Sequence, residues 1–299
     1  MQTGLGSLRY FAEVARTGSI REASERLHVA TSAISRQVAK LEHEAGVPLF
    51  ERQPRGMVLT AAGEVLAAYA RRRMREEEQV LDEMRELHAG QRRTVEVASS
   101  EGFAQDVLPE AMASFRAQHP GVRFRLHVTT PAAATRQVVE GVADLAVTFS
   151  TAPEQGIRVE HSERHEIRAL VRADHPLAER AEAELADLLP YPLALMEEGT
   201  TLRQLFDICC SMEGLQFDPV FVSNHSIALH SFARLSGGVT LTGRLSVRRR
   251  LDQEGLVAIP LTNPELLQRN LQIQTMAQRR LPAPVRDFVD HLIGTIRDD

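Results

Sequence analysis

The sequence predicts a helical head with a β-hairpin wing, a long connecting helix, and an α/β body made of two similar subdomains. Three observations predict this fold: two short amphipathic helices followed by a hairpin within the first sixty residues, a run without proline from residue 60 to 88, and an order of strands and helices that recurs in the remainder. The chain has 299 residues. That length is too great for one ordinary hydrophobic core and indicates two or three domains.

The head is predicted to contain a helix-turn-helix. Apolar residues recur at helical spacing from Leu8 onward, so the chain opens with an amphipathic helix that ends at Gly18. Ser19 and Glu22 have the spacing of a capping box, which predicts a second, short helix reaching about Leu27. After a four-residue break, apolar positions of a third helix follow at Ile34, Val38 and Leu41. Two short helices joined by a tight turn make the motif.

The polar side of this third helix suits the major groove of DNA, because small hydroxyls approach bases closely and Arg or Gln can contact base edges. The alternative is an ordinary solvated helix face. Two β-capable runs around residues 53–56 then predict a hairpin, a wing whose arginines would reach phosphates or the minor groove. The candidate DNA-binding residues are Thr31, Ser32, Ser35, Arg36, Gln37, Lys40, Arg52 and Arg55.

The charge distribution agrees with a nucleic-acid partner for the head. The whole chain has a formal net charge of −5, yet residues 1–60 carry eight Lys/Arg and six Asp/Glu. Lys40 is the single lysine, so nearly every cation is an arginine. A guanidinium group is always charged and binds phosphate through two parallel hydrogen bonds.

The connecting helix is predicted over residues 60–88. Its apolar residues form an interrupted stripe, made of Leu66, Tyr69, Ala70, Val80, Met84 and Leu87. A helix of this length does not bury such a stripe against a sixty-residue head alone, so we expect it to pair with a second copy of the chain. A lone solvated spacer is the alternative. Residues 89–94 are predicted to form a hinge.

The body contains an internal repeat. Strands predicted at residues 95–99, 122–129 and 144–149 alternate with helices, and the same order returns with strands at 192–196, 217–223 and 239–242. Alternating strands and helices predict mostly parallel sheets, here in two subdomains with a cleft between them.

A ligand of such sheets binds beyond the carboxyl ends of the strands, where free amides at helix N-termini favour an anion. Hydrogen-bonding side chains follow four of the predicted strands. Helix capping is the alternative role for each of them. The candidate effector-binding residues are Ser99, Ser100, Thr148, Thr200, Thr201, Asn224 and His225.

The chain resembles the LysR-type transcriptional regulators. The resemblance extends over the whole chain and is strongest over residues 8–63. It is carried by Phe11, Gly18, Ser19, Ala23, Ser24, Leu27, Val29, Ser32, Ala33, Ile34, Ser35, Arg36, Gln37, Leu41, Glu42, Gly46, Val47, Pro48, Leu49, Phe50, Arg52, Leu59, Thr60, Ala61, Ala62 and Gly63. Two departures are Ala30-Thr31, where relatives often have Ser-Gln, and Gly243, where they often have proline.

The resemblance implies a regulator of transcription that binds operator DNA and responds to a small, anionic effector. It implies a winged helix-turn-helix domain over residues 1–59, a dimerisation helix over 60–88, a hinge over 89–94 and an effector-binding domain over 95–299 with the fold of periplasmic solute-binding proteins. Subdomain I would take residues 95–161 and 267–299, and subdomain II residues 162–266, with crossings near 161–163 and 263–266. Two chains would pair through the connecting helix, and a homotetramer would be a dimer of dimers.

Other classes of function find less support in the sequence. The adjacent Cys209 and Cys210 do not make a disulfide framework, and His161 and His165 lie in an extended segment, where the i, i+4 spacing does not bring metal ligands together. No nucleotide-binding or nucleophile motif is present, so we expect no catalytic residue, no metal and no cofactor. A solute-binding or transport protein, or an enzyme that uses the same cleft, remains the alternative.

The sequence also bears on cellular location. The longest stretch without charged residues, 219–233, is too short and too polar to span a bilayer. The first twenty residues lack the pattern of a secretory signal. We therefore expect a cytoplasmic protein without a membrane partner.

Overall fold

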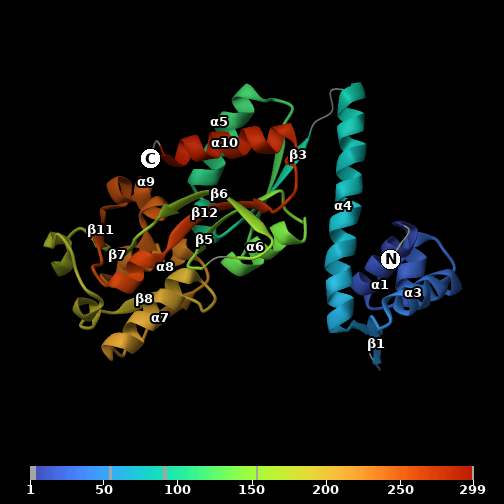
Figure 1. Ribbon diagram of the computed structural model, residues 1–299. Helices are drawn as coiled ribbons and strands as arrows, with labels where there is room; N and C mark the ends of the chain where they lie inside the picture. The colour runs from blue at the N-terminus through green and yellow to red at the C-terminus, as the bar shows by residue number, and fades with distance from the viewer. Residues whose placement is uncertain (1–4, 54–55, 90–92, 153, 298–299) are drawn as a thin grey trace. The chain divides into compact units, whose positions relative to one another are not determined.

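The computed structural model describes residues 5–53, 56–89, 93–152 and 154–297, apart from some side chains within its helices and strands (Figure 1). The chain divides into two compact units, one formed chiefly by residues 1–91 and the other chiefly by the residues that follow. Residues 90–92 of the predicted hinge lie outside the described residues.

The head begins with the three helices that the periodicity predicted. These are α1 (Leu5–Thr17), α2 (Ile20–Leu27) and α3 (Thr31–Ala45). Phe11 of α1 and Ile34 and Leu41 of α3 are fully buried, and the ring of Phe11 lies 5.1 Å from that of Phe50. One apolar stripe per helix therefore forms a common core.

The predicted capping box at the start of α2 is only half formed. The hydroxyl of Ser19 accepts the N–H of Glu22 at 3.3 Å, as expected. The N–H of Ser19 donates to the hydroxyl of Thr17 at 3.3 Å, and Glu22 is exposed. The prediction for Glu22 is therefore wrong, because a nearer side chain supplies the acceptor.

A two-stranded hairpin forms the predicted wing. Its strands are β1 (Phe50–Gln53) and β2 (Gly56–Leu59), which run antiparallel with Phe50 opposite Leu59. The Glu42 carboxylate of α3 accepts the N–H groups of Leu49 and Phe50 at 2.9 and 3.2 Å, so it joins the base of the hairpin to this helix. The N–H of Met57 donates to the carbonyl of Gly18 at 2.7 Å, which joins β2 to the α1–α2 turn.

The long helix α4 (Ala61–Ala89) starts immediately after the hairpin. The hydroxyl of Thr60 accepts the N–H of Gly63 at 3.0 Å and donates to the carbonyl of Pro48 at 2.8 Å. A Cβ at Gly63 would lie 2.0 Å from the carbonyl oxygen of Leu49, so only glycine fits where α4 crosses the hairpin. The first turns of α4 complete the core of the head through Leu66, Ala67 and Ala70.

The first sheet of the body has the strand order β4-β3-β5-β12-β6. Its strands are β3 (Thr94–Ser99), β4 (Arg123–Val128), β5 (Leu145–Ser150), β6 (Ile157–Arg164) and β12 (Asn270–Met276). Helices α5 (Val107–Gln118) and α10 (Ala283–Arg297) share one apolar cluster with this sheet, and α6 (Pro131–Val139) shares another. Neighbouring residues of β5 belong to different clusters, Leu145 to the first and Ala146 to the second, so the helices cover opposite faces.

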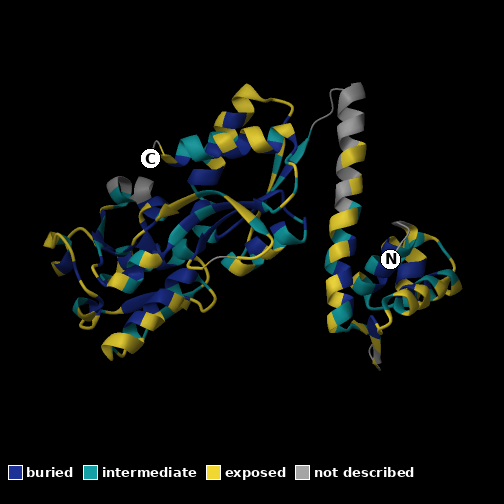
Figure 2. Ribbon diagram, viewed as in Figure 1, coloured by how far each residue is buried: buried dark blue, intermediate teal, exposed yellow. Residues whose placement is uncertain are grey.

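The second sheet has the order β11-β7-β10-β8-β9. Its strands are β7 (Ile167–Arg172), β8 (Leu193–Met196), β9 (Phe221–Ser223), β10 (Val239–Gly243) and β11 (Leu256–Pro260). Around it lie α7 (Thr201–Glu213), α8 (Ser226–Ser236), α9 (Arg244–Glu254) and the short 3-10 helices η2 (Pro176–Glu179), η3 (Leu185–Leu188) and η4 (Pro264–Gln268). Buried residues fill the space between the sheets and their helices (Figure 2).

The prediction of mostly parallel sheets is wrong. In the first sheet, β3 pairs in parallel with β4 and β5, but β12 pairs antiparallel with both β5 and β6. In the second sheet, β8 pairs in parallel with β9 and β10, but β7 pairs antiparallel with β10 and β11. In the first sheet the antiparallel strand β12 is the one that returns after the chain has passed through the second sheet, and in the second sheet the antiparallel strand β7 is the one by which the chain enters.

The chain crosses between the sheets twice. The first crossing lies between the end of β6 at Arg164 and the start of β7 at Ile167, just beyond the predicted residues 161–163, which belong to β6. The second leads from β11 through η4 to β12. Helix α9 and strand β11 were not predicted from the sequence. Among the described residues, no helix is both long and apolar enough to cross a membrane.

Candidate functional sites

The α3 helix presents most of the candidate DNA-binding residues on one side. Thr31, Ser32, Arg36 and Lys40 are exposed, whereas Ile34, Val38 and Leu41 are buried in the head. The nearest groups hold the two cations only weakly: Arg36 Nε donates to the carbonyl of Ser32 at 3.3 Å, and Lys40 lies 3.8 Å from Glu44. Both side chains are thus available to a partner.

Two candidates on α3 face other parts of the head. The Oε1 atom of Gln37 accepts the hydroxyl of Ser7, on α1, at 2.7 Å. Ser35 is half-buried beside a small hollow of about 90 Å³, which Phe50 and Met57 of the hairpin also line. Gln37 and Ser35 are therefore less exposed than Arg36.

The start of α3 lacks a side-chain cap. Ala30 occupies the cap position and makes no side-chain hydrogen bond. Of the predicted wing residues, Arg52 lies in β1 opposite Met57, and nothing is described of its side chain. Arg55 lies outside the described residues.

A cavity of about 570 Å³ lies between the two sheets of the body. Its volume suits a small organic molecule. The side chains and backbone that line it come from η1 (Glu101–Phe103), from the ends of β4, β5, β8 and β10, and from the first turns of α7, α8 and α9. The polar residues among them are Ser100, Glu101, Gln105, Thr129, Thr130, Glu197, Glu198, Thr200, Thr201, Asn224, His225, Ser226, Thr242, Ser246 and Arg269.

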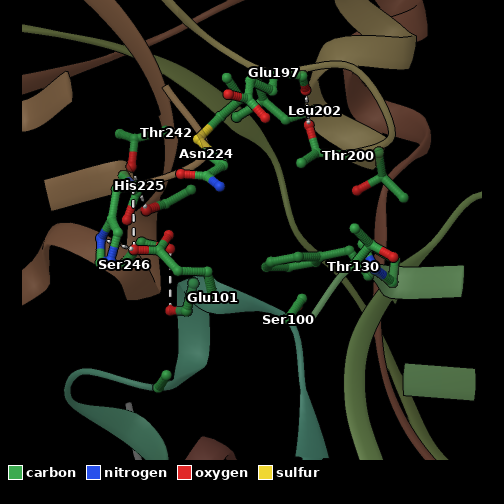
Figure 3. A pocket seen from close by; sticks show the side chains of 18 of the residues that line it. Ser100, Glu101, Thr130, Glu197, Thr200, Leu202, Asn224, His225, Thr242 and Ser246 are labelled. Carbon is green, nitrogen blue, oxygen red and sulfur yellow. Dashed lines mark hydrogen bonds and ion pairs between the residues drawn. The ribbon is translucent and has the colours of Figure 1, made fainter. Parts of the chain in front are cut away.

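Five of the seven candidate effector-binding residues line this cavity: Ser100, Thr200, Thr201, Asn224 and His225. Figure 3 labels four of them, Ser100, Thr200, Asn224 and His225. The hydroxyl of Ser100 is buried without a hydrogen-bond partner among the described residues, so a ligand could supply one. The hydroxyl of Thr200 accepts the N–H of Arg203 at 3.2 Å and is therefore a helix cap as well.

Ser99 and Thr148 do not line the cavity. Both are buried, and the hydroxyl of Ser99 donates to the carbonyls of Ser100 and Val147 at 2.8 and 3.1 Å. The reason is the alternation of a strand: neighbouring side chains point to opposite faces, so Ser99 points away from the space that Ser100 meets.

Glu101 was not predicted as a site residue, yet it lies at the centre of the contact between the two subdomains. Its Oε1 atom accepts the N–H of Ser226 at 3.1 Å and lies 3.4 Å from Nδ1 of His225. Nearby, the hydroxyl of Ser246 donates to the carbonyl of Gly102 at 3.2 Å (Figure 3). The first N–H group of α8, which we expected to be open to an anionic ligand, is therefore already bonded to a carboxylate of the chain itself.

Arg269 was also missed, because it lies in the second crossing and follows no predicted strand. It is 2% exposed, and its guanidinium carbon lies 3.6 Å from the centre of the Phe149 ring. Burial lowers the pKa of Arg269 to about 9, so it stays charged at neutral pH. Burial, together with the charges of Arg269, Arg168 and Arg244, lowers the pKa of His165 to about 3, so this ring is neutral.

The two cysteines have the properties of packing thiols. Burial and the Glu213 carboxylate raise the pKa of Cys209 to about 12, and burial raises that of Cys210 to about 11. Neither is a reactive thiolate at neutral pH. Within the described part of the chain, Cys209, Glu213 and Glu265 form the one group with metal-ligand spacing, but Glu213 instead accepts the Asn263 amide at 2.6 Å.

A winged helix-turn-helix joined by a long helix to a two-sheet, ligand-sized cavity defines the class of one-component transcription regulators. Residues 5–64 match the family of bacterial regulatory helix-turn-helix proteins of the lysR type, and residues 88–297 match the LysR substrate binding domain. The chain therefore belongs to the LysR family of transcriptional regulators.

Relatives and solved structures agree with this assignment. The transcriptional dual regulator GltC of Bacillus subtilis is 31% identical over 298 residues, covering 97% of this chain and 96% of that protein. A probable nitrogen assimilation transcriptional activator of Synechococcus elongatus is 29% identical, with 95% and 92% covered. A full-length OxyR variant from Pseudomonas aeruginosa superposes with a TM-score of 0.70 at 20% identity, with 99% of this chain and 95% of that one covered. CbnR in complex with its target DNA gives a TM-score of 0.62 at 20% identity, with 98% and 99% covered. These two structures share the fold.

Proposed function

We propose that this chain binds operator DNA through its winged helix-turn-helix and changes its regulatory output when a small effector occupies the cavity of the body. The observation that carries the proposal is the division of α3 into a buried apolar stripe and an exposed polar, cationic side. That division leaves Arg36 and Lys40 available to the major groove, while Ile34 and Val38 hold the helix to the head.

The residues proposed to contact DNA differ in their exposure. Thr31, Ser32, Arg36 and Lys40 would make the contacts of α3, with Ser35 and Gln37 at its margins. Arg52 and Arg55 of the wing would contact phosphates or the minor groove. The proposed parts are 1–59 for the DNA-binding domain, 60–88 for the connecting helix, 89–94 for the hinge and 95–299 for the effector-binding domain. Ala89 belongs to α4 and Thr94 to β3, so the hinge is shorter than proposed by one residue at each end.

We expect Arg36→Ala to weaken binding to a duplex selected by the wild-type chain from a random library by about 1–3 kcal/mol. The reason is the loss of a forked contact to a base edge. Affinities are measured at one fixed salt concentration, because phosphate contacts are salt-dependent.

The control for this measurement is Arg16→Ala. Arg16 belongs to the same head and carries the same charge, but it lies on α1 and pairs with Glu13 at 2.6 Å. Equal loss of affinity in both variants would mean that only overall charge matters and would contradict the assignment of α3.

We propose that the chain is a dimer through α4 and, as the resemblance implies, a tetramer built as a dimer of dimers. Among the described side chains of this helix, four large apolar ones remain exposed: Val65 at 73%, Tyr69 at 40%, Val80 at 51% and Leu81 at 44%. Burial of such side chains against a second copy would stabilise the pair. The side chains of Met84 and Leu87 lie outside the described residues.

We expect Ser100→Ala and Thr201→Ala each to weaken effector binding several-fold, because each removes one hydrogen bond worth about 0.5–1.5 kcal/mol. The matched control is Ser99→Ala, which removes a neighbouring hydroxyl that does not line the cavity. Titrations of a ligand found by thermal-shift screening provide the measurement. A larger effect of Ser99→Ala than of Ser100→Ala would contradict the proposed pocket, and DNA binding should be unchanged in all three variants.

The proposal involves no chemical reaction and no cofactor. The relatives that match this chain are named as regulators of transcription, and we infer that the effector leaves the cavity unchanged. Because the chain would act on the chromosome, we place it in the cytoplasm. Mass spectrometry of the ligand after incubation with the protein tests the point, since conversion of the ligand would favour the enzyme alternative.

A further inference from the structure

Arg269 is a buried charge at the cavity for which the chain supplies no counter-ion. Its side chain is 2% exposed and borders the cavity. Among the described residues it forms no ion pair and donates no hydrogen bond, and its buried Nε has no acceptor. A buried guanidinium without a partner is costly, so an arginine in this position calls for a ligand that supplies the missing charge.

The surroundings of Arg269 increase the need for an anion. The ring of Phe149 covers one side of the guanidinium at 3.6 Å, which leaves the N–H edges to make hydrogen bonds. The neighbouring His165 ring is neutral and supplies no negative charge. No carboxylate in the described part of the chain comes within ion-pair distance of Arg269, although Glu101, Glu197 and Glu198 line the same cavity.

The helix ends around the cavity are less suited to hold the anion. Glu101 already accepts the N–H of Ser226 at the start of α8, and the hydroxyl of Thr200 already accepts an N–H at the start of α7. Among the described residues that line the cavity, Arg269 is the only lysine or arginine.

Gly243 makes room for this arginine. A Cβ on residue 243 would lie 2.5 Å from Nη2 of Arg269 and 2.7 Å from Nε2 of His165. Any other residue would therefore displace the guanidinium or the imidazole. The glycine that stands where relatives often have proline thus has a physical explanation: it leaves space for the side chain of Arg269.

We propose that Arg269, with the space left by Gly243, selects an effector that carries a carboxylate group. This inference rests on the proposed function of the cavity and names the chemical class of its ligand. One planar guanidinium forms two parallel hydrogen bonds with one carboxylate. Apolar side chains in the same cavity, including Phe149, Met196, Leu202 and Ile227, would hold an apolar remainder of the ligand.

The test uses the full chain and a library of carboxylates with three to eight carbons, each paired with its uncharged primary amide, with inorganic phosphate and sulfate as further probes. Thermal shift identifies ligands, and calorimetry measures their affinities. We expect at least one carboxylate to stabilise the wild-type chain while its amide does not. We expect Arg269→Gln to weaken that carboxylate by a factor on the order of ten to one hundred. Arg286→Gln on the surface of α10 is the matched control and should bind like the wild type.

A second variant keeps the proposal testable if Arg269→Gln does not fold. Gly243→Ala retains the arginine but places a methyl group against it, so it should also lose the preference for carboxylate over amide. If either variant folds and prefers the carboxylate over its amide as strongly as the wild type does, the proposal is overturned. A wild-type chain that responds to no carboxylate, or that responds only to phosphate or sulfate, would overturn it as well.

DNA binding separates this inference from the proposed function. Binding of the wild-type chain to the selected duplex is measured in parallel. If the wild-type chain binds the duplex but shows no preference for a carboxylate over its amide, only the inference about Arg269 is refuted. Failure of the wild-type chain to bind any selected duplex would instead count against the proposed function.

Discussion

Phe11→Ala is expected to unfold the head while the body stays folded. Phe11 is 0% exposed, and its ring packs against Phe50 at the base of the wing. Truncation of a buried phenylalanine costs about 3–5 kcal/mol, most of the stability of a small domain. Binding to the selected DNA duplex should therefore be lost, because α3 depends on this core for its position.

Circular dichroism and calorimetry of the full chain measure the effect. Of the transitions expected for a chain with two units, that of the head should fall by more than about 10 °C, and that of the body should not change. Val47→Ala is the control, since Val47, between α3 and β1, is 45% exposed. Retention of full DNA affinity by Phe11→Ala at 37 °C would contradict the structure of the head.

Phe288→Ala is expected to produce the opposite result, a destabilised body and an intact head. Phe288 of α10 is 0% exposed, and its ring lies 5.3 Å from Phe115 and 4.5 Å from Phe124. Its truncation should also cost about 3–5 kcal/mol. Because the body is larger than the head, its transition should fall by a smaller amount, about 6–20 °C.

Limited proteolysis and ligand titration complete this test. The body of Phe288→Ala should be cleaved faster, and binding to the cavity should weaken in proportion to the fraction unfolded. Leu235→Ala, in which a residue that is 70% exposed is truncated, is the control. A change in the head transition with an unchanged body would show that α10 does not belong to the core of the first sheet.

The head was predictable because its structure depends on interactions between residues close in sequence. Ile34, Val38 and Leu41 lie on one side of a single helix, so their spacing alone indicates which side is buried. The exposure of Arg36 and Lys40 follows from the same geometry. Gln37 was assigned to the polar side, and the sequence contained no signal that Ser7 would contact it.

The body was predictable in its elements but not in their partners. Buried strands such as β5 and β8 are largely apolar runs that a single sequence shows. Strand β12 joins the first sheet after the chain has passed through the second, so its antiparallel pairing with β5 depends on the return path. Helix α9 was missed because its arginine-rich segment lacks a clear apolar period. Leu245 and Val247 of this helix are nevertheless buried.

The residues of the cavity also divide into those that the local sequence indicated and those that depend on residues distant in the chain. Ser100, Thr200, Thr201, Asn224 and His225 lie in the loops or helix starts that follow strands, and the rule for ligands of α/β sheets was enough to find them. Arg269 and Glu101 were not found. Their roles depend on Phe149, Gly243 and Ser226, which are far from them in sequence.

The sequence by itself therefore determined the helix-turn-helix, the wing, the long helix and the two repeated halves of the body, because short-range periodicity and capping encode each of these. Only the tertiary structure decided the strand order of the two sheets, the hydrogen bond from the first N–H of α8 to Glu101, and the burial of the Arg269 charge at the cavity. These features arise where segments distant in the chain meet, and burial in that setting decides which charges are neutralised and which remain for a ligand.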